Sequence, residues 1–175
     1  VHGLGIAMAS EVYKLTETER DEVLRTVVEQ ARGRVKIVMN TSAESTDVAI
    51  YYSCKAQDVG ADALMVRPAS YVPTTADQHV EYFVHIAEAV NIPIFLQDQS
   101  TAQVPPALAV RIAREHENLC YVKVETPPTV PRMAEANGLR GDSGLILFGG
   151  AGGAFCLEEY RRGSVGMMPG CTLPE

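Results

Sequence analysis

The stretch ALMVRPASYVPTTADQHVEYFVHIAEAVNIPIFLQD, residues 63–98, decides the fold because it contains one complete unit of strand, helix and strand. Residues 63–66 form a continuous apolar run, and the expected strand 63–68 ends at a proline. Residues 92–96 form a second apolar run, within the expected strand 92–98. The region between them, 75–90, carries apolar residues on one helical face, namely Val80, Phe83, Val84, Ala87 and Val90. Strands that are apolar throughout are typical of a parallel sheet covered by helices.

The same alternation runs through the whole chain. Strands are expected over 2–8, 35–40, 63–68, 92–98, 119–125, 144–150 and 164–170, and helices over 16–34, 45–60, 75–90, 105–116, 129–137 and 156–163. Short connections between such units predict an α/β protein. Seven units fit a (β/α)8 TIM barrel that lacks one unit. A doubly wound nucleotide-binding sheet would need G-x-G-x-x-G or a P-loop after an early strand, and GGAGGAF (149–155) fits neither.

Composition excludes several kinds of partner. The 175 residues suffice for a single domain, 1–175, and their net charge is −7. An acidic protein without a basic patch attracts neither nucleic acid nor an anionic membrane surface, and the longest basic cluster is only Arg161-Arg162. No apolar run approaches the length of a membrane span. We therefore expect no nucleic-acid partner and no membrane partner.

The cysteines and histidines predict no metal site. Cys54, Cys120, Cys156 and Cys171 form no C-x-x-C pair and fit no common zinc spacing. We interpret them as free thiols, which indicates a reducing cytoplasm. The four histidines lie on expected helices or near the termini, where solvated or packing roles are the rule.

Lys123, in the run LCYVKVE (119–125), is the most informative polar residue. Alternation along a strand directs Tyr121, Lys123 and Glu125 to one face. A lysine that points into a barrel loses hydration, which lowers its pKa and makes it a nucleophile toward ketones. The alternative is a structural lysine paired with Glu125 or another acid, and the residues alone leave both readings open.

Other polar and glycine-rich segments follow the ends of the expected strands, where TIM barrels carry their chemistry. Asn40, Thr41 and Ser42 follow the second strand, either as ligand contacts or as caps of the next helix. The glycines of 149–153 either let backbone N–H groups approach an anion or form a tight turn.

Three segments taken together resemble the dihydrodipicolinate synthase / N-acetylneuraminate lyase family. They are GADALMVRP (60–68), IAEAVNIPIFL (86–96) and LCYVKVE (119–125), and they occur in the family's order. The resemblance implies a (β/α)8 class I aldolase fold. On this register the chain covers family strands 2 to 8 and lacks the first strand and the C-terminal helices. Two unpaired edges would result, so we expect a fragment of a longer protein, or a barrel closed by a partner.

The resemblance assigns roles to several residues. Lys123 matches the family's Schiff-base lysine. Glu11 matches the glutamate of the family's G-T-T-G-E motif, but its threonines are absent, which leaves Ser10 to supply a hydroxyl. The family's P-Y-Y segment reads Pro-Ala-Ser here, with Tyr71 one residue later.

The largest departure from the family is Gln97, which stands where the family has a proton-relaying tyrosine. A glutamine cannot act as a general acid or base near neutral pH. The proton transfer is then left to Asp98, a substrate group or a water. The residues expected to be catalytic are Lys123, Gln97 and Asp98, and those expected to bind substrate are Ser10, Glu11, Thr41, Ser42, Ser70, Tyr71, Gly149 and Gly150.

The resemblance therefore implies a Schiff-base-forming lyase or aldolase, or a dehydratase, that acts on pyruvate or small 2-oxo (2-keto-3-deoxy) acids. It implies no cofactor and no metal, a cytoplasmic location, and a homo-oligomer, either a tetramer or a dimer. Two alternatives stay open. One is a non-catalytic relative that binds a keto acid, and the other is a phosphate-binding TIM-barrel enzyme whose glycine loop grips the phosphate.

Overall fold

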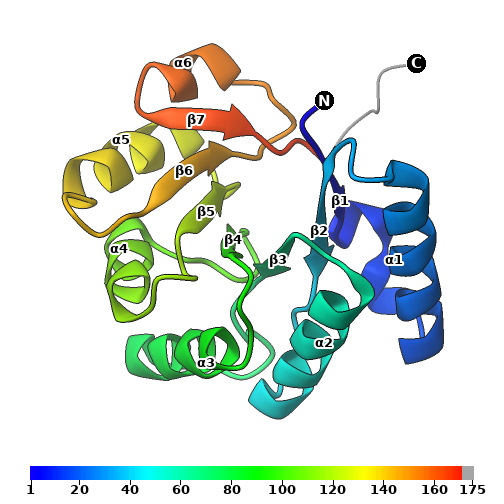
Figure 1. Cartoon of the computed structure of the whole chain (residues 1–175). Helices are drawn as coiled ribbons and strands as arrows, with labels where there is room; N and C mark the ends of the chain where they lie inside the picture. The colour runs from blue at the N-terminus through cyan, green and yellow to red at the C-terminus, as the bar shows by residue number, and fades with distance from the viewer. Residues whose placement is uncertain (171–175) are drawn as a thin grey trace.

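The seven expected strands all form, and each pairs in parallel with the next, so the sheet order follows the sequence. The computed structural model describes residues 1–170. Figure 1 shows the sheet curling with the helices outside it, as in a partial (β/α) barrel. The TIM-barrel prediction is confirmed in this form. The strands are β1 (Gly3–Ile6), β2 (Lys36–Asn40), β3 (Ala63–Val66), β4 (Ile94–Asp98), β5 (Tyr121–Val124), β6 (Ile146–Gly149) and β7 (Ser164–Met167).

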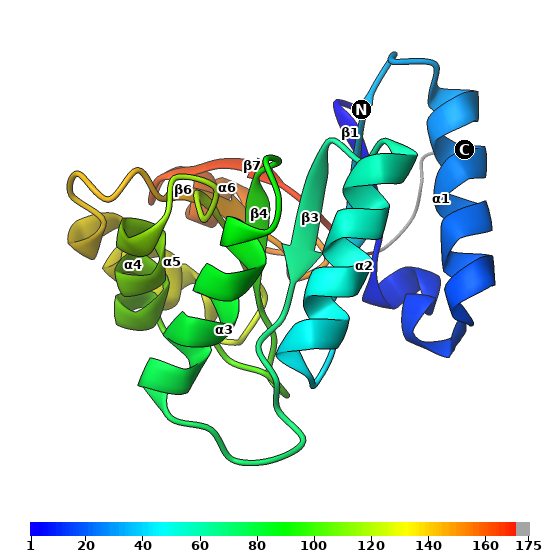
Figure 2. The ribbon, with the colours of Figure 1, turned by 60° about the horizontal axis from the view of Figure 1, so that its bottom comes forward.

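The expected helices also form, and local signals fix where two of them begin. Thr16 and Glu19 make a capping box at the start of one helix, and Thr75 and Gln78 make a second one. Consecutive helices pack side by side around the sheet, as Figure 2 shows for the first three. The helices are α1 (Glu17–Ala31), α2 (Thr46–Val59), α3 (Ala76–Glu88), α4 (Pro106–Glu115), α5 (Thr129–Leu139) and α6 (Cys156–Tyr160).

Two short 3₁₀ turns after β1 were not predicted. They are η1 (Met8–Ser10) and η2 (Val12–Lys14), and Glu11 joins them with φ at 53°. This left-handed backbone is uncommon for a residue with a side chain. The segment that follows β1 is therefore a compact double turn at the rim of the barrel.

Alternation along the strands separates two apolar layers. The larger layer lies between sheet and helices and includes Leu64, Phe83 and Leu96. The smaller layer lies inside the curled sheet and includes Met65 and Phe95. The neighbouring residues of one strand thus serve opposite layers, which is the period of two that strands impose.

Within residues 1–170, no helix combines the length and the apolar character needed to cross a membrane. Cys54, Cys120 and Cys156 are free thiols, as predicted, whereas Cys171 lies outside the described residues.

Gly166 of β7 allows the Phe148 ring to lie against the strand. A Cβ at position 166 would lie 2.9 Å from the Phe148 ring, whereas a Cβ at Gly138 of α5 would meet nothing within 4 Å. We expect Gly166→Ala to destabilise the protein by about 1–3 kcal/mol through overpacking. Gly138→Ala, the matched control, should be neutral or stabilising by up to about 1 kcal/mol. Urea unfolding measures both, and equal stabilities for the two variants would contradict the packing assignment.

Candidate active site

Lys123 lies on the inner face of β5, as the alternation of its strand predicts. The residue is 5% exposed, and its Nζ lies 3.0 Å from Oε1 of Glu125. Its register neighbours are Gln97 of β4 and Phe148 of β6. The pairing with Glu125 that was one of the two readings of this lysine is therefore present, and it sits at the carboxyl end of the strands.

A chain of hydrogen bonds connects this ion pair to β2. Gln97 donates from Nε2 to Oε2 of Glu125 over 3.0 Å, and Asn40 donates from Nδ2 to Oε1 of Gln97 over 3.1 Å. The backbone N–H of Ser42 donates to Oδ1 of Asn40 over 3.2 Å. The Ser42 N–H can only donate, so the Asn40 amide must turn its oxygen toward Ser42 and its nitrogen toward Gln97. Gln97 must then turn its own oxygen toward Asn40 and its nitrogen toward Glu125. Glu125 thus has a partner at each carboxylate oxygen, Lys123 at Oε1 and Gln97 at Oε2.

An aromatic floor lies beneath the polar chain. Phe95 and Tyr121 stack with ring centroids 4.6 Å apart, and Phe148 meets Phe95 edge-on at 5.1 Å. Apolar groups exclude water from that side of the ion pair, which strengthens the attraction between its members and raises the cost of separating them. Among residues 1–170, Gln97 is the residue whose side chain hydrogen-bonds to the pair.

Because Gly150 has no side chain, it leaves room for the side chains of Lys123 and Glu125. A Cβ at position 150 would lie 2.3 Å from Cγ of Glu125 and 2.8 Å from Cε of Lys123. The Gly150 N–H donates to Val124, and the Gly152 N–H donates to the Gly150 carbonyl. These two N–H groups are already bonded within the protein, which gives the segment 149–153 a packing and turn role.

Gly149 faces the other side of β6. A Cβ there would lie 2.0 Å from Oε2 of Glu159 and 2.5 Å from Sδ of Met167. Gly149 therefore makes room for the helix layer and is not beside Lys123.

Asp98 does not join Gln97 at the site. The two are consecutive in β4, so their side chains point to opposite faces, and Asp98 is 1% exposed on the helix side. There it accepts hydrogen bonds from Arg132 (2.8 Å), the Thr126 hydroxyl (2.8 Å) and the Val104 N–H (2.9 Å). Its backbone carbonyl accepts from the Glu125 N–H over 3.0 Å. The structure therefore places Asp98 behind the site, where it holds the end of β5.

Thr41 is also turned away from Lys123. It is fully buried, and its hydroxyl accepts a hydrogen bond from Ser53 of α2 over 2.9 Å. Ser42 is closer, because its N–H orients Asn40, while its hydroxyl accepts from the Arg67 N–H over 2.8 Å. Of Asn40, Thr41 and Ser42, Asn40 at the end of β2 is the one whose side chain lies on the inner face.

The carboxylate of Glu44 holds the loop that follows β3 in place. Glu44 accepts from the N–H groups of Ser70 and Tyr71, each over 2.9 Å, and pairs with Arg67 at 2.8 Å. The Tyr71 side chain is 87% exposed and points to solvent. Burial acts to raise the pKa of Glu44, but these hydrogen bonds outweigh it and hold the pKa below its usual value.

Ser10 and Glu11 occupy the exposed rim turns after β1. Glu11 pairs with the neighbouring Lys14 on the surface, where such pairs contribute little to stability. Neither residue bonds to Lys123 or to its chain of partners. They stay candidates for the outer part of a substrate pocket.

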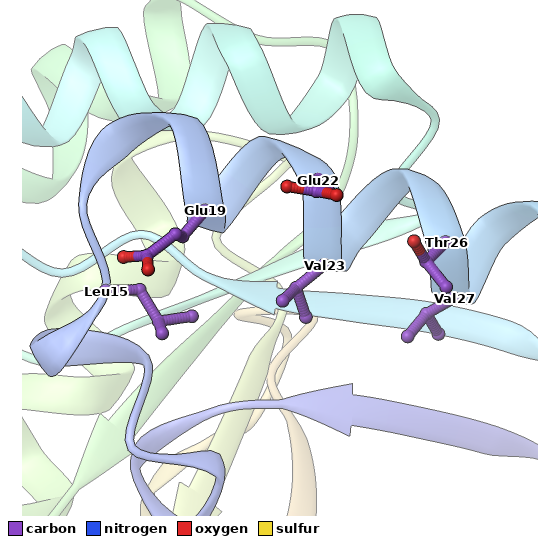
Figure 3. Close-up of a pocket in the computed structure, with 6 residues that line it drawn as sticks. All are labelled: Leu15, Glu19, Glu22, Val23, Thr26 and Val27. Atoms are coloured by element: carbon purple, nitrogen blue, oxygen red, sulfur yellow. The ribbon is translucent and has the colours of Figure 1, made fainter.

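A groove lies along α1, and its lining does not include Lys123. Figure 3 shows Leu15, Val23 and Val27 along this groove, with Glu19, Glu22 and Thr26 beside them. None of these residues belongs to the Lys123 chain. The described residues also contain no group of three or more His, Cys, Asp or Glu side chains that could hold a metal ion.

Two members of the polar chain were not among the predicted site residues. Glu125 lies two positions after Lys123, so strand alternation was enough to place it on the same face. Asn40 is the polar last residue of an otherwise apolar strand, which is a signal of the same kind. The two residues are linked through Gln97 of β4, and this link between separate strands has no signal in the sequence.

The pKa of Glu44 predicts a pH dependence of stability. A carboxyl whose pKa is lower in the folded state stabilises the fold at pH values above its unfolded pKa, near 4.3, and loses that contribution as pH falls through the folded value. We expect wild type to be more stable than Glu44→Gln at pH 7 and the difference to shrink below about pH 4.3. Urea unfolding of both proteins across this range tests it, and a difference that grows on acidification would contradict the assignment.

Comparisons with known proteins agree with this architecture. A sequence model described as the dihydrodipicolinate synthetase family matches residues 5–168. An L-2-keto-3-deoxyarabonate dehydratase of Azospirillum brasilense is 34% identical over 97% of this chain and 57% of its own length. A 4-hydroxy-tetrahydrodipicolinate synthase of Methylococcus capsulatus is 31% identical over 87% of this chain and 53% of its own length.

A solved structure of the same family has the same fold as this chain. The crystal structure of dihydrodipicolinate synthase from Aquifex aeolicus superposes with a TM-score of 0.88 at 25% identity, covering 96% of this chain and 58% of that one. The chain thus spans a little more than half the length of the curated relatives it matches. Because the family model covers nearly all of the described residues, the chain belongs to the dihydrodipicolinate synthetase family.

Proposed function

We propose that this protein is a Schiff-base lyase that dehydrates small 2-keto-3-deoxy acids. The observation that carries the proposal is the ion pair between Nζ of the buried Lys123 and Oε1 of the partly buried Glu125, 3.0 Å apart, with Gln97 bonded to the other carboxylate oxygen. An amine nucleophile thus has an acid–base group within hydrogen-bond reach. No metal is required by this chemistry.

Lys123 would supply the covalent step. Its amine adds to the C2 ketone of the substrate, and loss of water gives an imine between Nζ and C2. The protonated imine withdraws electrons from C3 and makes its hydrogen acidic. The aromatic floor supports this role, because a site with little water disfavours premature hydrolysis of the imine.

Glu125 would move the proton. The carboxylate takes a proton from C3, which forms an enamine, and the same carboxyl then protonates the 4-hydroxyl as the C4–O bond breaks. Water leaves, a C3–C4 double bond forms, and hydrolysis of the imine frees Lys123 with no net oxidation or reduction. One group suffices because the proton it receives is the proton it returns.

Gln97 favours dehydration over aldol cleavage. Cleavage of a 4-hydroxy-2-oxo acid needs a base on the 4-hydroxyl, and a glutamine cannot provide one. Dehydration needs an acid there, and Glu125 becomes that acid after the first proton transfer. The name of the Azospirillum relative, a dehydratase of a 2-keto-3-deoxy acid, supports the same substrate class.

The two alternatives have weaker support. A phosphate-binding loop at 149–153 would use backbone N–H groups, but those of Gly150 and Gly152 bond within the protein. A non-catalytic keto-acid binder would form the imine without turnover, which separates it experimentally from the enzyme. The homo-oligomer and the cytoplasmic location stay predictions.

Borohydride reduction in the presence of pyruvate tests the nucleophile. Peptide mass mapping should place a reduced pyruvyl adduct on Lys123, and Lys123→Ala should abolish it. Lys36→Ala, at a lysine whose side chain is 77% exposed, is the matched control and should trap like wild type. A folded wild-type protein that gives no adduct would overturn the proposed function.

Replacing Glu125 separates the imine from the proton transfer. We expect Glu125→Gln to keep the trapped adduct on Lys123 while turnover of L-2-keto-3-deoxyarabonate falls about 10²–10⁴-fold, the usual worth of a general acid–base group. Glu135→Gln, on the exposed side of α5, should leave turnover unchanged. Wild-type turnover in Glu125→Gln would remove Glu125 from the mechanism.

A further inference from the structure

Arg20 of α1 is a buried cation that forms no ion pair with the acidic side chains of residues 1–170. It is 6% exposed. Burial lowers the pKa of its guanidinium from the usual value. The cost of burying such a charge is large unless polar partners replace water, so the partners of Arg20 call for an explanation.

Those partners are two backbone carbonyls and one aromatic ring. Nη2 donates to the Asn40 carbonyl over 2.7 Å, and Nη1 donates to the Val12 carbonyl over 3.2 Å. The guanidinium carbon lies 4.3 Å from the centroid of the Tyr52 ring on α2. A planar fork of donors can satisfy two carbonyls at once, which a lysine cannot do in this geometry.

The Asn40 carbonyl needs this donor because the sheet does not provide one. The Thr41 N–H donates to Met65 of β3, so strand alternation directs the Asn40 carbonyl to the opposite side, toward β1. The ladder between β1 and β2 ends one residue earlier, at Ile6 opposite Met39. Arg20 therefore completes the ladder at the residue whose side chain enters the site.

The second carbonyl belongs to the rim. Val12 is 1% exposed and begins η2, directly after the strained Glu11. Arg20 thus joins the double turn after β1, which carries Ser10 and Glu11, to the end of β2. These two segments lie at the carboxyl ends of β1 and β2, the same end of the sheet at which Lys123 and Glu125 lie.

We propose that Arg20 is a positioning residue, which aligns Asn40, and through it Gln97 and Glu125, for proton transfer. The proposal rests on the proposed function. Arg20 touches neither Lys123 nor Glu125, so its effect passes through the hydrogen bonds from Asn40 to Gln97 and from Gln97 to Glu125. It belongs to the helix layer, on the opposite side of the sheet from the reacting groups.

Arg20→Lys in the full chain tests the proposal. We expect imine trapping with pyruvate at close to the wild-type level, while kcat for L-2-keto-3-deoxyarabonate falls about 10²-fold, the usual effect of a small misplacement, with little change in KM. Arg34→Lys is the matched control, because Arg34 likewise donates to two carbonyls, of Ala31 and Gln30, at the far end of α1. It should leave both readouts unchanged.

A double-mutant cycle distinguishes positioning from general destabilisation. If Arg20 acts through Asn40, adding Arg20→Lys to Asn40→Ala should lower kcat no further than Asn40→Ala alone. Additive losses, or a parallel fall in trapping and kcat, would overturn the proposal. Should Arg20→Lys fail to fold, Tyr52→Leu, which removes only the ring beside the guanidinium, should show the same selective loss of kcat, and an unchanged kcat would count against the proposal. Absence of trapping in wild type would instead overturn the proposed function, and with it the role of Arg20.

Discussion

An ion pair inside a curled sheet, between the buried Lys123 and the partly buried Glu125, is the constraint to which the rest of the site responds. Such a pair is stable with little water around it only if protein groups satisfy its hydrogen-bonding atoms. Gln97 and Asn40 meet that requirement from two other strands, and Gly150 leaves the volume free. One ion pair thus restricts the residues allowed at the ends of β2, β4, β5 and β6.

The two faces of the sheet carry charged residues with different roles. The inner face carries the groups that can react, whereas the outer face carries charged residues that hold backbone segments in place. Asp98 secures the end of β5 through Glu125 and Thr126, and Arg20 secures the end of β2. Each is buried, and each acts on the chain rather than on a ligand. Burial of a charged residue in this protein therefore does not indicate a role in the reaction unless the residue lies on the inner face of the sheet.

Much of the fold could be predicted from sequence, because local patterns determine it. Apolar runs, helical periodicity and a proline located the strands and helices, and the period of two placed Lys123 on the inner face. The same period, applied to β4 and to the residues after β2, would have turned Asp98 and Thr41 outward and Asn40 inward. The contacts of Gly150 and Arg20 could not be predicted, because they join segments that only the curled sheet brings together, and no local pattern records that distance.

The short separation between Lys123 and Glu125 has a consequence for how the site is primed. On the proposed mechanism, the shift of a single proton across 3.0 Å converts ammonium and carboxylate into a free amine and a carboxylic acid. Both reactive forms appear together, and the total charge of the pocket does not change. The neutral amide of Gln97 can neither supply nor remove that proton. When substrate arrives, one proton therefore moves between Lys123 and Glu125, and no proton has to come from the solvent.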